Sequence, residues 1–308
     1  MRSAARIYRL QLALALGGAA AVALGLLVVV RALDFSLPSA DTLFAACRGL
    51  LMPDAGAGAL LVLPLAGVAL LSLTLGGRSL VRQVRGKRRF LARLQIVRAA
   101  DVAGARVAVF ESARPQAFCA GFLQPRIYLS TAAAGLPVEH LDAIVAHERH
   151  HRRRRDPLRL LIARTLSEAL FFMPALRRLT ERYGALAELA ADEAAVREHD
   201  RSTLAAALLS FGEARNPAVV VGIAPERVDH LLGRPPRWEL PGSLLVGSAV
   251  AIGGLVGAAM TVRALTSAAD LNLPLLVAQS CMLLMLVLAL LLGAAGLVLG
   301  RPLLHRRS

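Results

Sequence analysis

The chain has few cysteines, few aromatic residues and almost no lysine. Its three cysteines, Cys47, Cys119 and Cys281, stand far apart in 308 residues and indicate no disulfide framework. Aromatic residues make up 4% of the chain, which leaves few rings to stack on nucleic-acid bases. Lys87 is the only lysine among 36 basic residues, so the net charge of +15 indicates an arginine bias and attraction to anionic lipid. We therefore expect no direct binding of nucleic acid.

Charged residues are missing from four long stretches, which predict membrane helices. The predicted spans are 10–30, 55–77, 244–262 and 273–299, the last within an uncharged run over 271–300. About 20 apolar residues cross a bilayer core of ~30 Å as a helix. Four buried helices of a soluble protein would need an unusually large core. The first run is longer than the apolar part of a signal peptide, and no cleavage site follows it directly, so we expect an uncleaved anchor.

The distribution of arginine predicts the orientation. Basic residues gather before the first run, after the second and after the fourth, whereas the two remaining loops have few. The positive-inside rule then places both termini and residues 78–239 in the cytoplasm, with the chain in the inner (cytoplasmic) membrane. We predict a mainly α membrane protein with four transmembrane helices: a membrane region over 1–77, a cytoplasmic domain over 78–239 and a second membrane region over 240–308.

The cytoplasmic domain is predicted to be mostly helical with one small β-sheet. Its apolar runs and turn signals predict the following elements: strands at 107–110, 117–122 and 127–130, and helices over about 137–155, 156–173, 175–199 and 203–214. Asp156 and Pro157 suit the N-cap and first position of a helix. Gly76-Gly77 and the basic residues up to Arg89 are interpreted as the entry from the membrane into this domain.

The segment His147-Glu148-Arg149-His150-His151 has the pattern H-E-x-x-H on a predicted helix. Residues four apart share a helix face, so the imidazoles of His147 and His151 can bind one Zn²⁺ while Glu148 acts as the base that activates water. The pattern alone also fits a solvated helix that carries histidine beside arginine. His150 points away from the shared face.

A catalytic zinc ion needs a third protein ligand and an open position. Glu188 is the candidate, because Glu188 and Asp192 share a face of a second predicted helix. Asp192 could accept a hydrogen bond from a zinc-binding imidazole and fix its tautomer. We therefore predict one Zn²⁺ per chain, held by His147, His151 and Glu188.

Several segments together resemble the BlaR/MecR-type antirepressor metallopeptidases. The segments that carry the resemblance are 117–122, 125–130, 147–156, 171–174, 188–192 and 226–232. HtpX-type membrane proteases share the H-E-x-x-H and E-x-x-x-D elements. The resemblance implies a zincin-like metallopeptidase domain in which His147, His151 and Glu188 bind zinc and Glu148 is the catalytic base.

The resemblance also implies a protein substrate. In the antibiotic-sensing members a large extracellular penicillin-binding domain follows the last membrane helix, whereas this chain ends at Ser308, so we do not expect it to sense antibiotics. One candidate substrate is a transcriptional repressor of the BlaI/MecI type, cleaved near the membrane as part of signal transduction. The alternatives are an HtpX-like protease that removes misfolded membrane proteins and a membrane scaffold without catalysis.

The stretch from Ala117 to Ser130 is the candidate for substrate binding. An edge strand can pair with an extended substrate backbone, so Cys119, Ala120 and Gly121 are predicted to contact the substrate. The same stretch would equally serve as a core hairpin, with Cys119 as a small buried residue. Arg227 and His230 are further candidates for stabilising a tetrahedral oxyanion.

Overall fold

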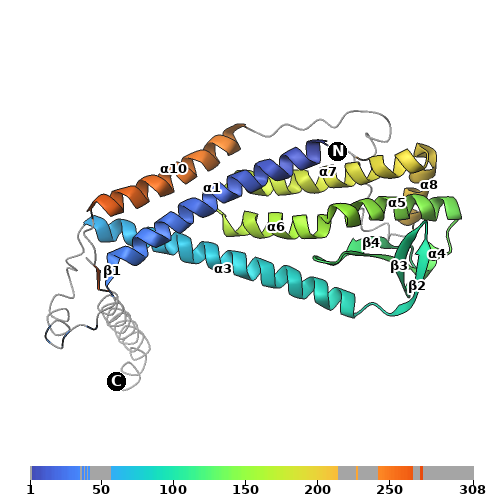
Figure 1. Cartoon of the computed structure of the whole chain (residues 1–308), viewed down its shortest axis with the longest axis horizontal. Coiled ribbons are helices and arrows are strands. Elements are labelled where there is room, and N and C mark those ends of the chain that lie inside the picture. The colour runs from blue at the N-terminus through green and yellow to red at the C-terminus, as the bar shows by residue number, and fades with distance from the viewer. Residues whose placement is uncertain are drawn as a thin grey trace, which may run out of the picture. The chain divides into compact units, whose positions relative to one another are not determined.

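The computed structural model describes residues 2–34, 37, 39, 41, 57–213, 227, 242–265 and 271–272. Long helices and one four-stranded sheet make up most of this part of the chain (Figure 1). The helices are α1 (Arg2–Ala32), α3 (Ala57–Ala92), α4 (Thr131–Ala134), α5 (Val138–Arg154), α6 (Asp156–Ala169), α7 (Pro174–Glu198), α8 (Arg201–Glu213) and α10 (Gly242–Leu265). The chain divides into two compact units, Met1–Ala20 with Leu71–Ile252 and Ala21–Leu70 with Gly253–Ser308.

Three helices are long and apolar enough to cross a membrane: Ser3–Ala32, Leu61–Ala92 and Gly242–Leu265. They confirm helices at three of the four predicted spans, and the fourth, 273–299, lies outside the described residues. α3 runs without a break through Gly76-Gly77 to Ala92, so the predicted boundary after residue 77 does not interrupt the helix. Glycine costs a helix only about 1 kcal/mol. At Gly76 it also admits a close neighbour, because an added Cβ would lie 2.9 Å from the Cβ of Ala169.

The second unit has its own apolar core. Val28 and Val29 of α1, Val62 and Leu65 of α3, and Val262 of α10 are buried together. Two short strands, β1 (Leu33–Asp34) and β6 (Leu271–Asn272), pair in parallel beside this core.

The sheet of the first unit has the strand order β2-β3-β5-β4. Its strands are β2 (Ile96–Val102), β3 (Ala105–Phe110), β5 (Arg126–Ser130) and β4 (Ala117–Ala120). Only β3 and β5 are parallel, and β4 pairs with β5 as the predicted strand pair. The hairpin between β2 and β3 turns at Ala103 and Gly104, both with positive φ, as the type I′ form of a two-residue hairpin turn requires. β2 was not predicted, because most of its side chains are exposed and give no alternating pattern.

α5 covers one face of the sheet and also contacts two other helices. Leu141 and Val145 of α5 pack on Ile127 and Leu129 of β5 in one buried cluster. Another cluster joins Ala143 and Ala146 of α5 to Ala195 of α7 and Leu204 of α8. Alanine at these positions leaves room for the helix backbones to come close. The predicted helices are confirmed, with ends shifted by a few residues.

Candidate metal centre

α5 places the two histidines of the H-E-x-x-H pattern side by side. His147 and His151 are 6% and 8% exposed, and their Nε2 atoms lie 3.2 Å apart. Two ligand atoms on a tetrahedral zinc ion lie roughly 3.3–3.4 Å apart, given zinc–ligand bonds of about 2.0–2.1 Å. The two imidazoles therefore face each other at the separation that a shared metal ion requires.

Glu188 of α7 completes the group. Its Oε2 lies 3.5 Å from Nε2 of His147, and its Oε1 lies 3.5 Å from Nε2 of His151. Each distance is close to the edge length of a zinc tetrahedron, and the two from Glu188 involve its two different oxygens. His147, His151 and Glu188 form a group that could hold a metal ion, as the sequence predicted. The Glu188 side chain is 44% exposed, so the group is reachable from solvent on this side.

Asp192 lies one turn after Glu188 and is fully buried. Its Oδ1 is 2.9 Å from Nδ1 of His147, on the side of the ring opposite to the metal-binding nitrogen. Arg227 donates from Nε to Oδ2 of the same carboxylate over 2.7 Å, and its Nη1 lies 3.5 Å from Oε2 of Glu188. The structure thus gives Arg227 a partner on α7. Its role at an oxyanion stays a prediction, and His230, the other candidate, lies outside the described residues.

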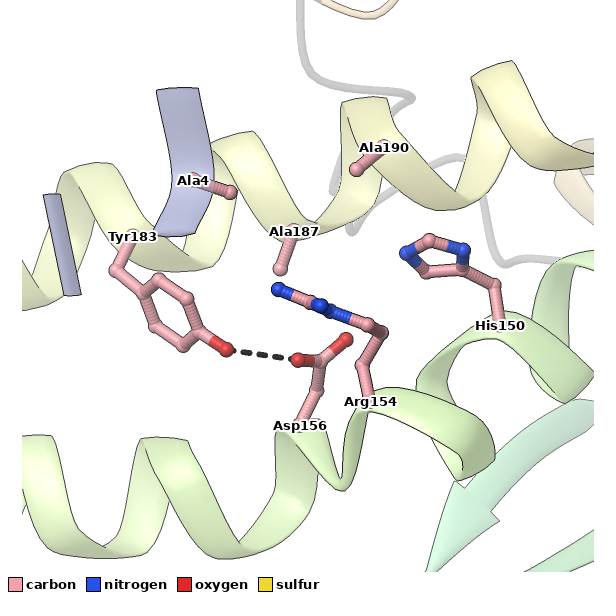
Figure 2. Close-up of a pocket in the computed structure, with 7 residues that line it drawn as sticks. All are labelled: Ala4, His150, Arg154, Asp156, Tyr183, Ala187 and Ala190. Atoms are coloured by element: carbon pink, nitrogen blue, oxygen red, sulfur yellow. Dashed lines mark hydrogen bonds between the residues drawn. The ribbon is translucent and has the colours of Figure 1, made fainter. Parts of the chain in front are cut away.

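Asp156 has a different place from the one predicted. Arg155 is the N-cap residue of α6, whereas Asp156 is the first residue of the helix, and Oδ2 of Asp156 lies 2.8 Å from Nδ1 of His151. In one continuous helix a residue five positions on would lie about 140° around the axis. Here Arg155 has a left-handed backbone conformation, φ 53, which ends α5 and directs Asp156 back toward His151. The hydroxyl of Tyr183 on α7 donates to the other oxygen of Asp156 over 2.7 Å (Figure 2).

His150 stands outside the metal group, as its helix position predicted. It lines a small pocket with Ala4, Arg154, Asp156, Tyr183, Ala187 and Ala190 (Figure 2). Burial lowers the pKa of His150 to about 4, so the ring is neutral at physiological pH.

Glu148 lies between the histidines and the edge of the sheet. It is 8% exposed, and it accepts a hydrogen bond from the backbone N–H of Cys119 in β4. The predicted substrate-binding segment therefore adjoins the predicted base. Gly121, at the end of β4, has φ 109, and an added Cβ would lie 2.7 Å from the carbonyl oxygen of Gln124. The turn itself thus requires glycine at this position.

Burial and charge shift several pKa values in opposite directions. Burial raises the pKa of Glu148, and it raises that of the Cys119 thiol to about 12, so this thiol stays protonated. Burial alone would lower the pKa of His147, but its contacts with Asp192 and Glu188 and the charge of Glu148 raise it to about 10. Burial would raise the pKa of Glu188 and Asp192, but the histidines and Arg227 together outweigh it and lower each pKa to about 2. Without a metal the group is therefore an ion-paired cluster.

Sequence reasoning missed Tyr183 and assigned Asp156 to a helix cap. For Asp156 a signal was present, since Asp156 follows His151 closely and precedes Pro157, a position where helices restart. For Tyr183 no local pattern exists, because it lies 27 residues from its partner Asp156.

A protein-family comparison matches the part of the chain that contains the metal group. The family described as BlaR1 peptidase M56 matches residues 57–231, which is more than half of the chain and includes every residue of the metal group. A search of curated proteins finds no match to the chain.

Proposed function

Because the chain belongs to the BlaR1 peptidase family M56, we propose that it is a zinc-dependent membrane endopeptidase that cleaves a protein in the cytoplasm or close to the membrane. The observation that carries the proposal is the cluster of ligand atoms from His147, His151 and Glu188, which all lie within 4.8 Å of one another. The two Nε2 atoms are 3.2 Å apart, and each lies 3.5 Å from one of the two Glu188 oxygens. Catalytic zinc sites can have two imidazoles and one carboxylate as protein ligands, with a further position open to water or substrate.

Both histidine rings are oriented by a buried carboxylate. Asp192 and Asp156 contact the Nδ1 atoms of His147 and His151, which leaves both Nε2 atoms free to bind metal. When bound, Zn²⁺ would polarise the substrate carbonyl and acidify water. Half-exposed Glu188 stands on the side from which water and substrate can enter.

Glu148 is the proposed general base. It would take a proton from the attacking water and deliver it to the leaving amide nitrogen, so that one carboxylate serves both halves of the reaction. Burial raises the pKa of Glu148 and so brings it closer to neutral pH. A group with such a pKa can both take up and release a proton efficiently.

The substrate is proposed to bind as an added strand along β4. In the described part of the sheet, β4 pairs with β5 and forms the edge. Cys119 lies on this strand, and its N–H reaches Glu148, so a peptide alongside β4 would pass the base. Ala120 and Gly121 extend the same segment.

The substrate class is proposed from the family. A transcriptional repressor of the BlaI/MecI type is the leading candidate. The proposed location is the inner membrane, with the peptidase domain and both termini in the cytoplasm.

The test of the substrate compares cells that express the wild type with cells that express Glu148→Gln, using mass spectrometry to find protein termini formed only with the wild type. One cleaved regulator supports the repressor proposal, and many cleaved membrane proteins support quality control.

The variant Glu148→Gln distinguishes catalysis from metal binding, because Glu148 is not one of the proposed zinc ligands. Glu148→Gln should retain about one zinc per chain in the purified protein and lose cleavage by about 10²–10⁴-fold. Glu139→Gln, at an exposed position in the first turn of α5, is the matched control and should cleave like the wild type. Identical new termini with wild type and Glu148→Gln would contradict the assignment of the base.

A further inference from the structure

Both oxygens of the Asp156 carboxylate have a hydrogen-bond partner. Its side chain is buried, one oxygen lies 2.8 Å from Nδ1 of His151, and the other accepts the Tyr183 hydroxyl over 2.7 Å. Tyr183 is 1% exposed, and burial raises its pKa, so its hydroxyl remains a donor. A buried carboxylate that receives two hydrogen bonds has one orientation, and that orientation is passed on to the imidazole.

The contact joins three different helices. His151 lies in the last turn of α5, Asp156 starts α6, and Tyr183 lies in the first half of α7, the helix that also carries Glu188. The hydroxyl of Tyr183 therefore ties the junction of α5 and α6 to the helix that supplies the third metal-binding residue. A rotation of His151 away from Glu188 would break this hydrogen-bonded chain.

The other face of Tyr183 rests on the first membrane helix. The rings of Tyr8 in α1 and Tyr183 lie 5.0 Å apart between centroids, tilted by 40°. Ala4 packs in the same cluster, and the α1 segment that carries it passes beside Tyr183 in Figure 2. One turn further along α1, Gln11 donates from Nε2 to Oγ1 of Thr180 on α7 over 2.7 Å. Contacts from α1 therefore fix the part of α7 where Tyr183 stands.

We propose that Tyr183 is a positioning residue for the metal site: its hydroxyl orients Asp156, Asp156 orients His151, and α1 holds the tyrosine ring in place. The inference rests on the proposed zinc site and adds a residue outside the H-E-x-x-H and E-x-x-x-D elements. It also makes the first membrane helix part of the support of the metal centre.

The test measures zinc affinity in the full-length, detergent-purified chain by competition with a chromophoric chelator. Tyr183→Phe keeps the ring and removes the hydroxyl, and it should weaken zinc binding about tenfold, the lower range for the loss of a group that supports a metal ligand. Tyr8→Phe is the matched control, because the ring contact remains and no hydrogen bond of its hydroxyl is present among the described residues. It should bind zinc like the wild type.

A double variant distinguishes positioning from a general loss of packing. If Tyr183 acts through Asp156, then Tyr183→Phe/Asp156→Asn should bind zinc no more weakly than Asp156→Asn alone. Asp156→Asn also keeps the test open if Tyr183→Phe does not fold, since it leaves the tyrosine packing intact and should itself weaken zinc binding by more than tenfold.

Three results would overturn the inference. They are a zinc affinity of Tyr183→Phe within twofold of Tyr8→Phe, independent losses that multiply in the double variant, and normal zinc binding by Asp156→Asn. Each leaves the proposed peptidase intact if the wild type binds zinc. A well-folded wild type that binds no zinc would overturn both proposals together.

Discussion

Asp192 has two cationic partners: Arg227 donates to both oxygens of its carboxylate, and Nδ1 of His147 lies 2.9 Å from Oδ1. A fully buried carboxylate is costly unless both oxygens are paired, and here each has a partner. The same arrangement holds the His147 ring with Nε2 toward Glu188. At this scale the site is a set of ion pairs that a metal ion would reorganise rather than a group of free donors.

Replacing Asp192 should weaken metal binding without removing a metal ligand. Asp192→Asn removes the negative charge and replaces one acceptor oxygen with an NH₂ donor, so the contacts with His147 and with both Arg227 nitrogens cannot all be kept. We expect zinc affinity to fall by about 10–100-fold, measured by chelator competition. Glu181→Gln, an exposed position on the same helix, should leave the affinity unchanged. Equal affinities for Asp192→Asn and Glu181→Gln would show that the contact with His147 does not support the ligand.

The raised pKa of His147 predicts how zinc binding depends on pH. The ring is protonated up to about pH 10 in the metal-free chain, and zinc binds only the neutral ring. One proton must therefore leave for each zinc bound, and the apparent affinity should rise about tenfold per pH unit between about pH 6 and 8. With an unshifted imidazole the slope would level off above about pH 7. Titration in a series of buffers measures the slope.

The raised pKa of His147 also makes the stability of the folded, metal-free chain depend on pH. Because the folded-state pKa of His147 lies above its unfolded value of about 6.5, its contribution to the stability of the metal-free chain is complete below about pH 6.5. This contribution is lost as the pH rises toward about 10. Chemical unfolding of the metal-free protein at several pH values should show this decline, and a rise in stability over the same interval would contradict it.

At the scale of elements, the site depends on how closely α5 and α7 approach. The positions in contact are small: Ala146 on α5 and Ala195 on α7 lie in one buried cluster and are 3% and 0% exposed. This spacing brings Glu188 to both histidines at 3.5 Å. A helix pair held apart by larger side chains could not offer all three donors to one ion.

A larger side chain between these helices should therefore damage stability and metal binding together. Ala143 is 0% exposed and packs against α7 and α8, so Ala143→Leu should lower the free energy of unfolding by about 1–3 kcal/mol. It should also reduce zinc retention. Val138→Leu, at a position that is 71% exposed on the same helix, is the control. Thermal unfolding and zinc content of both variants check the prediction.

At the scale of the whole molecule, three apolar helices and a family of membrane peptidases define the class of protein. The side of the membrane on which the site lies is predicted from the distribution of arginine. Exposed apolar side chains along the helices, such as Leu16 at 70% and Leu70 at 65%, fit helices that meet lipid.

The predicted orientation can be measured with single cysteines. In a variant without Cys47, Cys119 and Cys281, Leu37→Cys lies beyond the end of α1 and should react with an impermeant maleimide in intact spheroplasts. Ala113→Cys, exposed in the loop between β3 and β4, should react only after lysis. The opposite labelling pattern would place the metal group outside the cell and exclude a cytoplasmic substrate.

The sequence by itself determined the features that depend on local spacing. Four-residue steps predicted that His147 and His151 share one helix face and that Glu188 and Asp192 share another, and uncharged runs predicted three of the observed long helices. The need for a third zinc ligand joined the two motifs into one predicted site, which the family resemblance also implied, and the structure brings His147, His151 and Glu188 together.

Only the tertiary structure decided which distant residues support that site. The left-handed turn at Arg155 redirects Asp156 from a helix cap to His151, and no helical periodicity predicts such a turn. Tyr183 and Arg227 reach their partners across 27 and 35 residues, through helix packing that local patterns do not specify. β2 forms because its backbone pairs with β3, although its exposed side chains carry almost no pattern. Periodicity is a property of neighbours in the chain, whereas these contacts depend on how separate elements pack.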